Sequence, residues 1–185
     1  MRAILLMILA LCALCTTAQA AQPPRPYSGG GVLLLAAVPG AEKVPVPVYA
    51  EPGLHRIAER ELAALPRVAG DPQQPLVAVS AVKSGWLRIA YDDAGREGWI
   101  ETARSWQYLP WDEFLPGRTV RVFPGMKKIL YALRGEPREK GPERGALTRD
   151  QRVRVVQLLD DWARLQAPAG WFRWRDGDGR LTVAP

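Results

Sequence analysis

The chain has 185 residues, and 25 Lys and Arg against 19 Asp and Glu give it a formal net charge of +6. A nucleic-acid-binding protein would concentrate its basic residues in a stripe interleaved with aromatics, whereas here basic and acidic residues alternate, as in the segment 134–143. We therefore expect no nucleic-acid partner. Both cysteines, Cys12 and Cys15, lie near the N-terminus, so the rest of the chain excludes a disulfide framework, a cysteine nucleophile and a cysteine metal site.

Residues 1–20 have the pattern of a cleaved secretory signal peptide. Arg2 is followed by an apolar run over residues 3–14 and by the small-x-small triplet at 18–20. The run is shorter than the roughly 20 residues that cross a membrane. Leucines, not small residues, precede both cysteines, which disfavours lipidation. The sequence therefore predicts a secreted, periplasmic protein with no membrane span once the signal is removed.

The remaining residues divide into two modules of strand-like segments. The predicted parts are a flexible leader with one candidate strand (21–42), a first module (43–104), an aromatic join (105–117) and a second module (118–185).

In the first module, alternating valines and prolines at 44–49 predict an edge strand that turns at Pro52-Gly53. Good helix formers at helical spacing predict a short helix over His55–Leu65. The residues 76–91 are strand-like, the turn at 92–95 supplies a hairpin, and Gly98-Trp99-Ile100 returns as its partner strand.

The aromatic join and the second module complete the chain. We expect the aromatic side chains of the join to be buried between the two modules: Trp106, Tyr108, Trp111 and Phe114. The strands expected in the second module are 119–123, 151–159, 162–166, 171–175 and 181–183. A long charged loop at 133–147 is either mobile or functional.

An internal repeat relates the two modules. A constant shift along the chain superposes Val77, Val79, Val82 and Trp86 on Val153, Val155, Leu158 and Trp162. Further upstream, the segment 48–53 is similar to 122–125. This pattern indicates a duplicated module rather than a solenoid, whose repeats are shorter.

The repeated motifs resemble those of the bacterial SH3-like (SH3b) domain family. In that family a Val-x-Val-Tyr-x-x-Pro-Gly start precedes a strand that ends in Gly-Trp-x-x-Val and a Gly-x-x-Gly-Trp-Val hairpin. The matching segments of the first module are 46–53, 85–89 and 95–100, and those of the second are 122–125, 161–165 and 170–172.

The resemblance implies a mostly β protein of two tandem SH3-like small β barrels, with the short helix as an insertion in the first. Family members bind peptidoglycan or act as adaptors in envelope proteins. The resemblance therefore implies that the protein is a non-catalytic binding module for peptidoglycan or its stem peptides. The alternative is an adaptor that recruits another envelope protein through the join or the loop at 133–147.

Five residues are candidates for ligand binding: Trp99, Trp171, Arg173, Trp174 and Arg175. Arginine forks fit carboxylates bidentately, and peptide stems carry carboxylates. The alternative is a partly exposed cross-strand pair with cation–π cover. Strand alternation places Arg173 and Arg175 on one face and Trp174 on the other. Trp86 and Trp162 are instead expected in the structural core.

No motif indicates catalysis, a metal or a cofactor. Asp176-Gly177-Asp178-Gly179 is similar to half of a calcium loop, but Arg180 stands where a further oxygen ligand would be needed, so we expect a plain turn. His55 is the only histidine and has no partner for a metal site or an acid–base triad. We expect no enzyme; carboxylates brought together only by the fold remain the one catalytic alternative.

Overall fold

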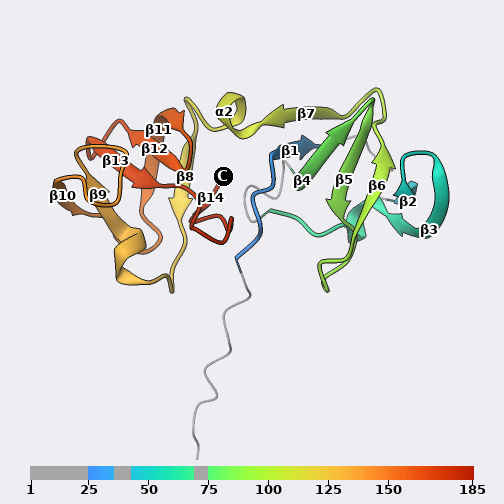
Figure 1. Ribbon diagram of the computed structural model, residues 1–185, viewed down its shortest axis with the longest axis horizontal. Coiled ribbons are helices and arrows are strands. Elements are labelled where there is room, and N and C mark those ends of the chain that lie inside the picture. The colour runs from blue at the N-terminus through green and yellow to red at the C-terminus, as the bar shows by residue number, and fades with distance from the viewer. Residues whose placement is uncertain (1–24, 36–42, 69–74) are drawn as a thin grey trace, which may run out of the picture.

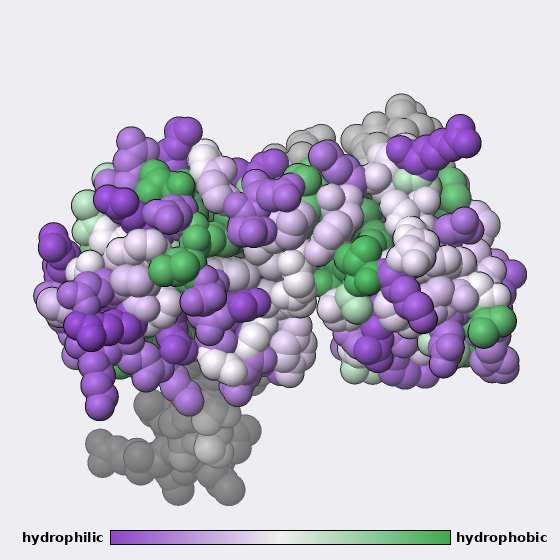
Figure 2. Space-filling view, turned by 45° about the horizontal axis from the view of Figure 1, so that its top comes forward, coloured by the Kyte–Doolittle hydropathy of each residue, from purple (hydrophilic) through white to green (hydrophobic). Residues whose placement is uncertain are grey.

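The computed structural model describes residues 25–35, 43–68 and 75–185, so the predicted signal peptide lies outside the described residues. This part of the chain is mostly β, as predicted, and forms two seven-stranded antiparallel sheets (Figure 1). In the space-filling view the two sheets form two lobes that lie side by side (Figure 2).

The first sheet runs in the order β3-β2-β6-β5-β4-β1-β7. Its elements are β1 (Gly31–Leu34), β2 (Pro45–Glu51), β3 (Leu54–Glu61), the 3₁₀ turn η3 (Leu62–Ala64), β4 (Leu76–Lys83), β5 (Trp86–Ala90), β6 (Glu97–Glu101) and β7 (Gln107–Pro110).

A one-turn helix, α2 (Trp111–Phe114), leads into the second sheet. That sheet runs in the order β10-β9-β13-β12-β11-β8-β14. Its elements are β8 (Thr119–Val122), the 3₁₀ turn η4 (Lys128–Tyr131), β9 (Ala132–Arg134), β10 (Glu143–Ala146), β11 (Arg152–Leu159), β12 (Trp162–Leu165), β13 (Gly170–Arg173) and β14 (Val183–Ala184).

The two sheets repeat the same path of the chain. In the second sheet, strands β8 to β14 occupy the positions that β1 to β7 occupy, in the same order, in the first sheet. Irregularities repeat as well, because the ladder is bulged between Val79 and Ala81 and again between Val155 and Gln157. The Gly30 N–H donates to the Val79 carbonyl at 2.8 Å, and the Gly117 N–H donates to the Val155 carbonyl at 2.8 Å. These shared details support a duplication.

One part of the sequence alignment is wrong. Val122 ends β8, which corresponds to β1, whereas Val48 and Tyr49 lie in β2, which corresponds to β9. The similarity between 48–53 and 122–125 therefore joins segments at different places in the sheet. Short valine-rich strands before Pro-Gly turns carry too little information to fix their position.

The helix predicted over His55–Leu65 is a further correction, because most of it is strand β3. The whole of β2 pairs with β3 across the turn at Pro52 and Gly53, where Gly53 has a φ of 73°. Only Leu62–Ala64 form a single 3₁₀ turn. Helix propensity is a weak preference, and here the ladder to β2 satisfies the backbone groups instead. His55 is exposed in this strand.

The expected loop at 133–147 and the expected join take up more structure than the sequence indicated. The loop expected at 133–147 is a hairpin of β9 and β10. In the first sheet, β1 lies between β4 and β7. The first sheet thus includes residues from the expected leader and from the expected join.

The join packs between the sheets, as predicted for two of its aromatic residues. Trp111 and Phe114 are buried and contact each other edge to face, with ring centroids 5.7 Å apart. Trp111 also contacts Trp174 of the second sheet at 5.7 Å. One hydrophobic core includes both of them together with Val32 of the first sheet. Trp106 and Tyr108 pack instead against the core of the first sheet.

Residues 25–30, which we call the strap, contact both sheets. The Leu181 N–H donates to the Pro26 carbonyl at 2.9 Å, and the Ser28 N–H donates to the Gly179 carbonyl at 2.8 Å. The Ser28 carbonyl accepts a hydrogen bond from Trp111 Nε1 at 2.7 Å. The strap then continues into β1 in the interior of the first sheet.

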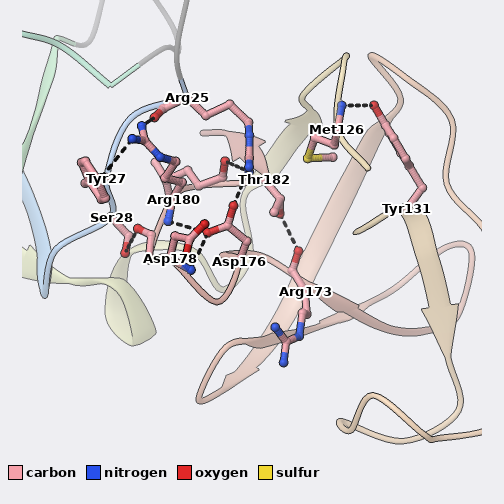
Figure 3. Close-up of polar contacts among 12 residues, drawn as sticks. Arg25, Tyr27, Ser28, Met126, Tyr131, Arg173, Asp176, Asp178, Arg180 and Thr182 are labelled. Atoms are coloured by element: carbon pink, nitrogen blue, oxygen red, sulfur yellow. Dashed lines mark hydrogen bonds and ion pairs between the residues drawn. The ribbon is translucent and has the colours of Figure 1, made fainter. Parts of the chain in front are cut away.

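Asp176 fastens the strap to the second sheet (Figure 3). Its Oδ1 accepts from the backbone N–H groups of Asp178 and Arg180, at 3.0 and 2.9 Å, which confirms the predicted turn. Its Oδ2 accepts from Arg25 Nη2 at 2.5 Å. Burial on its own would raise the pKa of Asp176, but the hydrogen bonds from Arg180 and Arg25 outweigh it and hold that pKa below its usual value.

We predict that Asp176→Asn lowers the free energy of unfolding at pH 7 by about 2 kcal/mol, the order of a hydrogen bond to a charged group. Because the folded-state pKa is lowered, this stabilisation is complete above the unfolded pKa of about 4 and is lost as the pH falls through the folded value. Denaturant unfolding at pH 7 and at about pH 3 measures both effects.

Asp178→Asn is the matched control, since this exposed side chain lies in the same turn. It should stay within about 0.5 kcal/mol of the wild type, as surface substitutions usually do. A loss in Asp176→Asn that is undiminished at low pH would contradict the role of the charge.

Candidate functional site: the basic groove of the second sheet

The five predicted ligand residues do not form one site. Trp99 of β6 and Trp171 of β13 hold equivalent places in the two sheets and are partly exposed. Arg173 lies on the same strand as Trp171 and is also partly exposed. The remaining two, Trp174 and Arg175, follow β13 and have structural partners.

Trp174 is a correction, because its side chain is only 2% exposed. Its Nε1 donates to the Asp160 carbonyl at 2.8 Å, and its ring lies in the core that includes Trp111. Arg175 covers the Trp174 ring at 4.9 Å and donates from Nε to Asp161 Oδ1 at 2.5 Å. Both side chains therefore stabilise the fold.

The two tryptophans expected in the core lie on the outer faces of the sheets. In β5 the core positions are Leu87 and Ile89, while Trp86 is partly exposed and contacts Tyr49 with ring centroids 5.3 Å apart. The core assignment of Trp86 is therefore wrong. Trp162 begins β12 at the equivalent position and is buried, 8% exposed, as predicted. It is covered from outside the sheet, by Arg173 among others.

A groove of about 690 Å³ lies beside β9 and β10, and we call it the η4 groove. Its lining includes three cationic side chains, Lys128, Arg134 and Arg149, and one acid, Glu143. Its apolar lining includes Met126, Ile129, Tyr131 and Leu147. Polar residues are dense on the lobe of the second sheet (Figure 2).

The cations of the groove differ in how they are held. Arg134 is 13% exposed and donates from Nη1 to Glu143 Oε2 at 3.3 Å and to the Gly141 carbonyl at 3.4 Å. Lys128 and Arg149 are exposed, and neither makes an ion pair with any described residue. Their charges are therefore available to an anionic ligand.

The wall formed by η4 is fixed from beneath by Tyr131. The Tyr131 hydroxyl donates to the Phe123 carbonyl at 3.0 Å. It also accepts from the Met126 N–H at 3.2 Å (Figure 3). Its ring is buried, whereas Ile129 on the same turn is 62% exposed. This arrangement presents an apolar side chain beside the cations on a rigid support.

A smaller pocket adjoins the groove, and we call it the Trp162 pocket. It has a volume of about 80 Å³ and shares Ile129, Ala132 and Arg134 with the η4 groove. Its other lining residues are Leu130, Glu139, Trp162 and Arg173. Of the predicted ligand residues, Arg173 lines the Trp162 pocket, and Trp171 lies opposite Arg134 in the β13–β9 pairing.

Sequence reasoning missed Lys128, Arg134 and Arg149. Arg134 lies in the loop expected at 133–147, and Lys128 and Arg149 lie outside the expected strands. Only the folding of η4 and the β9–β10 hairpin brings the three together. The available signal was the pair of lysines at 127–128, which directly precedes the apolar run 129–133.

The described residues show no group of three or more His, Cys, Asp or Glu placed to hold a metal ion. Within the same ranges, no helix has the length and apolar character needed to cross a membrane. The η4 groove places cationic side chains beside apolar walls.

We predict that Trp162→Ala lowers the free energy of unfolding by about 3–5 kcal/mol, the usual loss for a buried tryptophan. The matched substitution Trp86→Ala should lower it by about half as much or less, because that indole is already partly exposed. Denaturant unfolding of the two variants compares equivalent positions. Equal losses would contradict the different cover of the two side chains.

Comparison with family models, with curated proteins and with solved structures gives no match to this chain.

Proposed function

We propose that the protein is a non-catalytic binding protein of the cell envelope that takes carboxylate-bearing ligands in the η4 groove. The observation that carries the proposal is the placement of exposed Lys128 and Arg149 beside the apolar Ile129, with no acidic partner among the described residues. Cationic donors next to an apolar wall suit a peptide carboxylate with its side chains.

We infer that the two sheets are SH3-like small β barrels. The repeated strand order supports this inference, as does the behaviour of β11. Its first residues pair with β8 and its later residues pair with β12, with a bulge between Val155 and Gln157. A bulged strand that serves two parts of a sheet is how small sheets curve toward closure.

Peptidoglycan stem peptides are the first candidate ligand. They carry free carboxylates, and the signal pattern in residues 1–20 supports export to the periplasm, where such peptides occur. The proposal assigns no reaction, cofactor or metal to the protein.

The test is retention of the protein on purified peptidoglycan sacculi at low salt and at ~0.3 M salt, where screening weakens non-specific attraction. We predict retention of the wild type at both salt concentrations. The double variant Lys128→Ala/Arg149→Ala should bind about tenfold more weakly, since each exposed charge pair contributes up to about 1 kcal/mol.

The matched control is Lys83→Ala/Arg104→Ala, which removes one exposed lysine and one exposed arginine from the predicted first module (43–104). It should bind like the wild type. Equal weakening of both double variants would mean that net charge alone attracts the protein to the polymer. Undiminished binding of Lys128→Ala/Arg149→Ala would place the site elsewhere.

A second candidate function, an adaptor for another envelope protein, is favoured by one feature. Strand β3 lies at an edge of the first sheet, and its Leu54 and Ile57 are 63% and 40% exposed. An open edge with apolar side chains can pair with a strand of a partner. Failure of the wild type to bind sacculi at either salt concentration would favour this alternative.

A further inference from the structure

The Arg173 side chain in the Trp162 pocket leaves a buried hydrogen-bond donor unused. Its Nη2 lies 2.9 Å from Glu139 Oε1, and its guanidinium covers the Trp162 ring at 5.3 Å. Its Nε is buried and has no hydrogen-bond partner among the described residues. A buried donor without a partner is unfavourable and calls for a physical explanation.

A carboxylate that meets the edge of a guanidinium takes two parallel hydrogen bonds. The edge formed by Nε and Nη2 offers such a pair of donors, and Glu139 uses only the second. The site is therefore half filled by a carboxylate of the chain itself.

Of the two partners, Glu139 is the one that is free to leave. Its side chain is 69% exposed, whereas that of Arg173 is 22% exposed. The turn that carries Glu139 is closed by its own backbone hydrogen bonds, from Gly135 N–H to the Pro142 carbonyl at 2.7 Å and from Gly141 N–H to the Arg138 carbonyl at 3.0 Å. Loss of the ion pair would leave this turn intact.

Arg173, in contrast, is held in place. Its backbone carbonyl accepts a hydrogen bond from Thr182 Oγ1, and its side chain points away from that contact (Figure 3). The Trp162 ring supports the guanidinium from one side. Arg173 is thus a fixed cation, and its exposed partner Glu139 can be replaced by the carboxylate of a ligand.

The first sheet has neither the arginine nor the glutamate-bearing turn of this site. Trp162 pairs with Arg173 across β12 and β13, and the equivalent Trp86 pairs with Glu101 across β5 and β6. The β2–β3 connection is the tight turn at 52–53, while the equivalent β9–β10 connection extends over 135–142 and carries Glu139. The arginine and the glutamate-bearing turn therefore occur together in the second sheet.

We infer that Glu139 is a displaceable occupant of a carboxylate site on Arg173, and that a ligand carboxylate enters by replacing it and accepts from both Nε and Nη2. The inference rests on the proposed function. It adds Arg173 as the residue that anchors the ligand carboxylate and Glu139 as the side chain that the ligand displaces. The neighbouring apolar lining, Ile129, Leu130 and Ala132, leaves about 80 Å³, which suits a small substituent beside the carboxylate. The ligand class is thus a free carboxylate next to a small apolar side chain.

The experiment follows the NMR signal of the Arg173 Nε–H group while N-acetylalanine is added, with N-acetylalanine amide as the uncharged probe. We expect the acid, and not the amide, to shift this signal in the full protein. In Glu139→Gln the acid should bind about two- to fivefold more tightly, because the competing exposed ion pair is gone.

Glu136→Gln is the matched control. Glu136 lies on the same turn, but its Oε2 pairs with Arg138 Nη2 at 2.6 Å rather than with Arg173. The affinity of the Glu136→Gln variant for N-acetylalanine should equal that of the wild type. Equal affinities of Glu139→Gln and Glu136→Gln, or an Arg173 signal that does not respond to the acid, would overturn the inference.

The outcome separates this inference from the proposed function. A response of Arg173 to N-acetylalanine, with tighter binding in Glu139→Gln but no retention on sacculi, would leave the carboxylate site standing and reject the wall ligand. Retention on sacculi with an unresponsive Arg173 would reject the displacement of Glu139 and leave the η4 groove as the binding surface.

Discussion

The hydrogen bonds of the strap are the constraint on which the two-sheet arrangement depends. No cysteine follows Cys15, so beyond that residue packing and hydrogen bonds must hold the sheets together. The strap bonds to the turn of Asp176, its Ser28 carbonyl accepts from the central Trp111, and it continues as β1 between β4 and β7. A loss at the strap would therefore disturb the Trp111 contact and the placement of a strand at the same time. We expect such shared contacts to couple the unfolding of the two sheets.

Within this frame the duplicated backbone has kept its hydrogen-bonding pattern while the outer face has changed its chemistry. Trp99 pairs with Tyr49 in the first sheet, and the equivalent Trp171 pairs with Arg134 in the second. The exchange of Tyr49 for Arg134 parallels that of Glu101 for Arg173. Backbone groups must be paired wherever the sheet forms, so the bulges and turns are constrained in both copies. Outer-face side chains carry no such requirement, and they are free to specialise for binding.

The sequence was informative where local signals and the tertiary structure agree. The hairpins beginning at Trp86 and Trp162 were predictable because alternation, turns and the repeat coincide. The helix over 55–65 was wrong because its propensity is local, whereas the pairing of β3 with β2 depends on the turn before it. The η4 groove could not be predicted, since it forms between Lys128, Arg134 and Arg149 only after η4 and the β9–β10 hairpin pack together. Arg173 was predicted from the chemistry of arginine forks and lines the Trp162 pocket, but Trp174 beside it is buried in the core rather than placed for a ligand.

Strand alternation explains why the tryptophan repeat predicted the positions of the strands better than it predicted the burial of Trp86 and Trp162. The repeat fixed where β5 and β12 begin, yet the core side of each strand is held by the residue after the tryptophan, Leu87 or Ala163. An indole on an outer face must find cover elsewhere. Trp86 finds an edge contact with Tyr49, while Trp162 is covered by a guanidinium. A cation over an indole is fixed in place while keeping donors for a ligand. The Arg173 guanidinium can therefore cover Trp162 and still serve the carboxylate site proposed above.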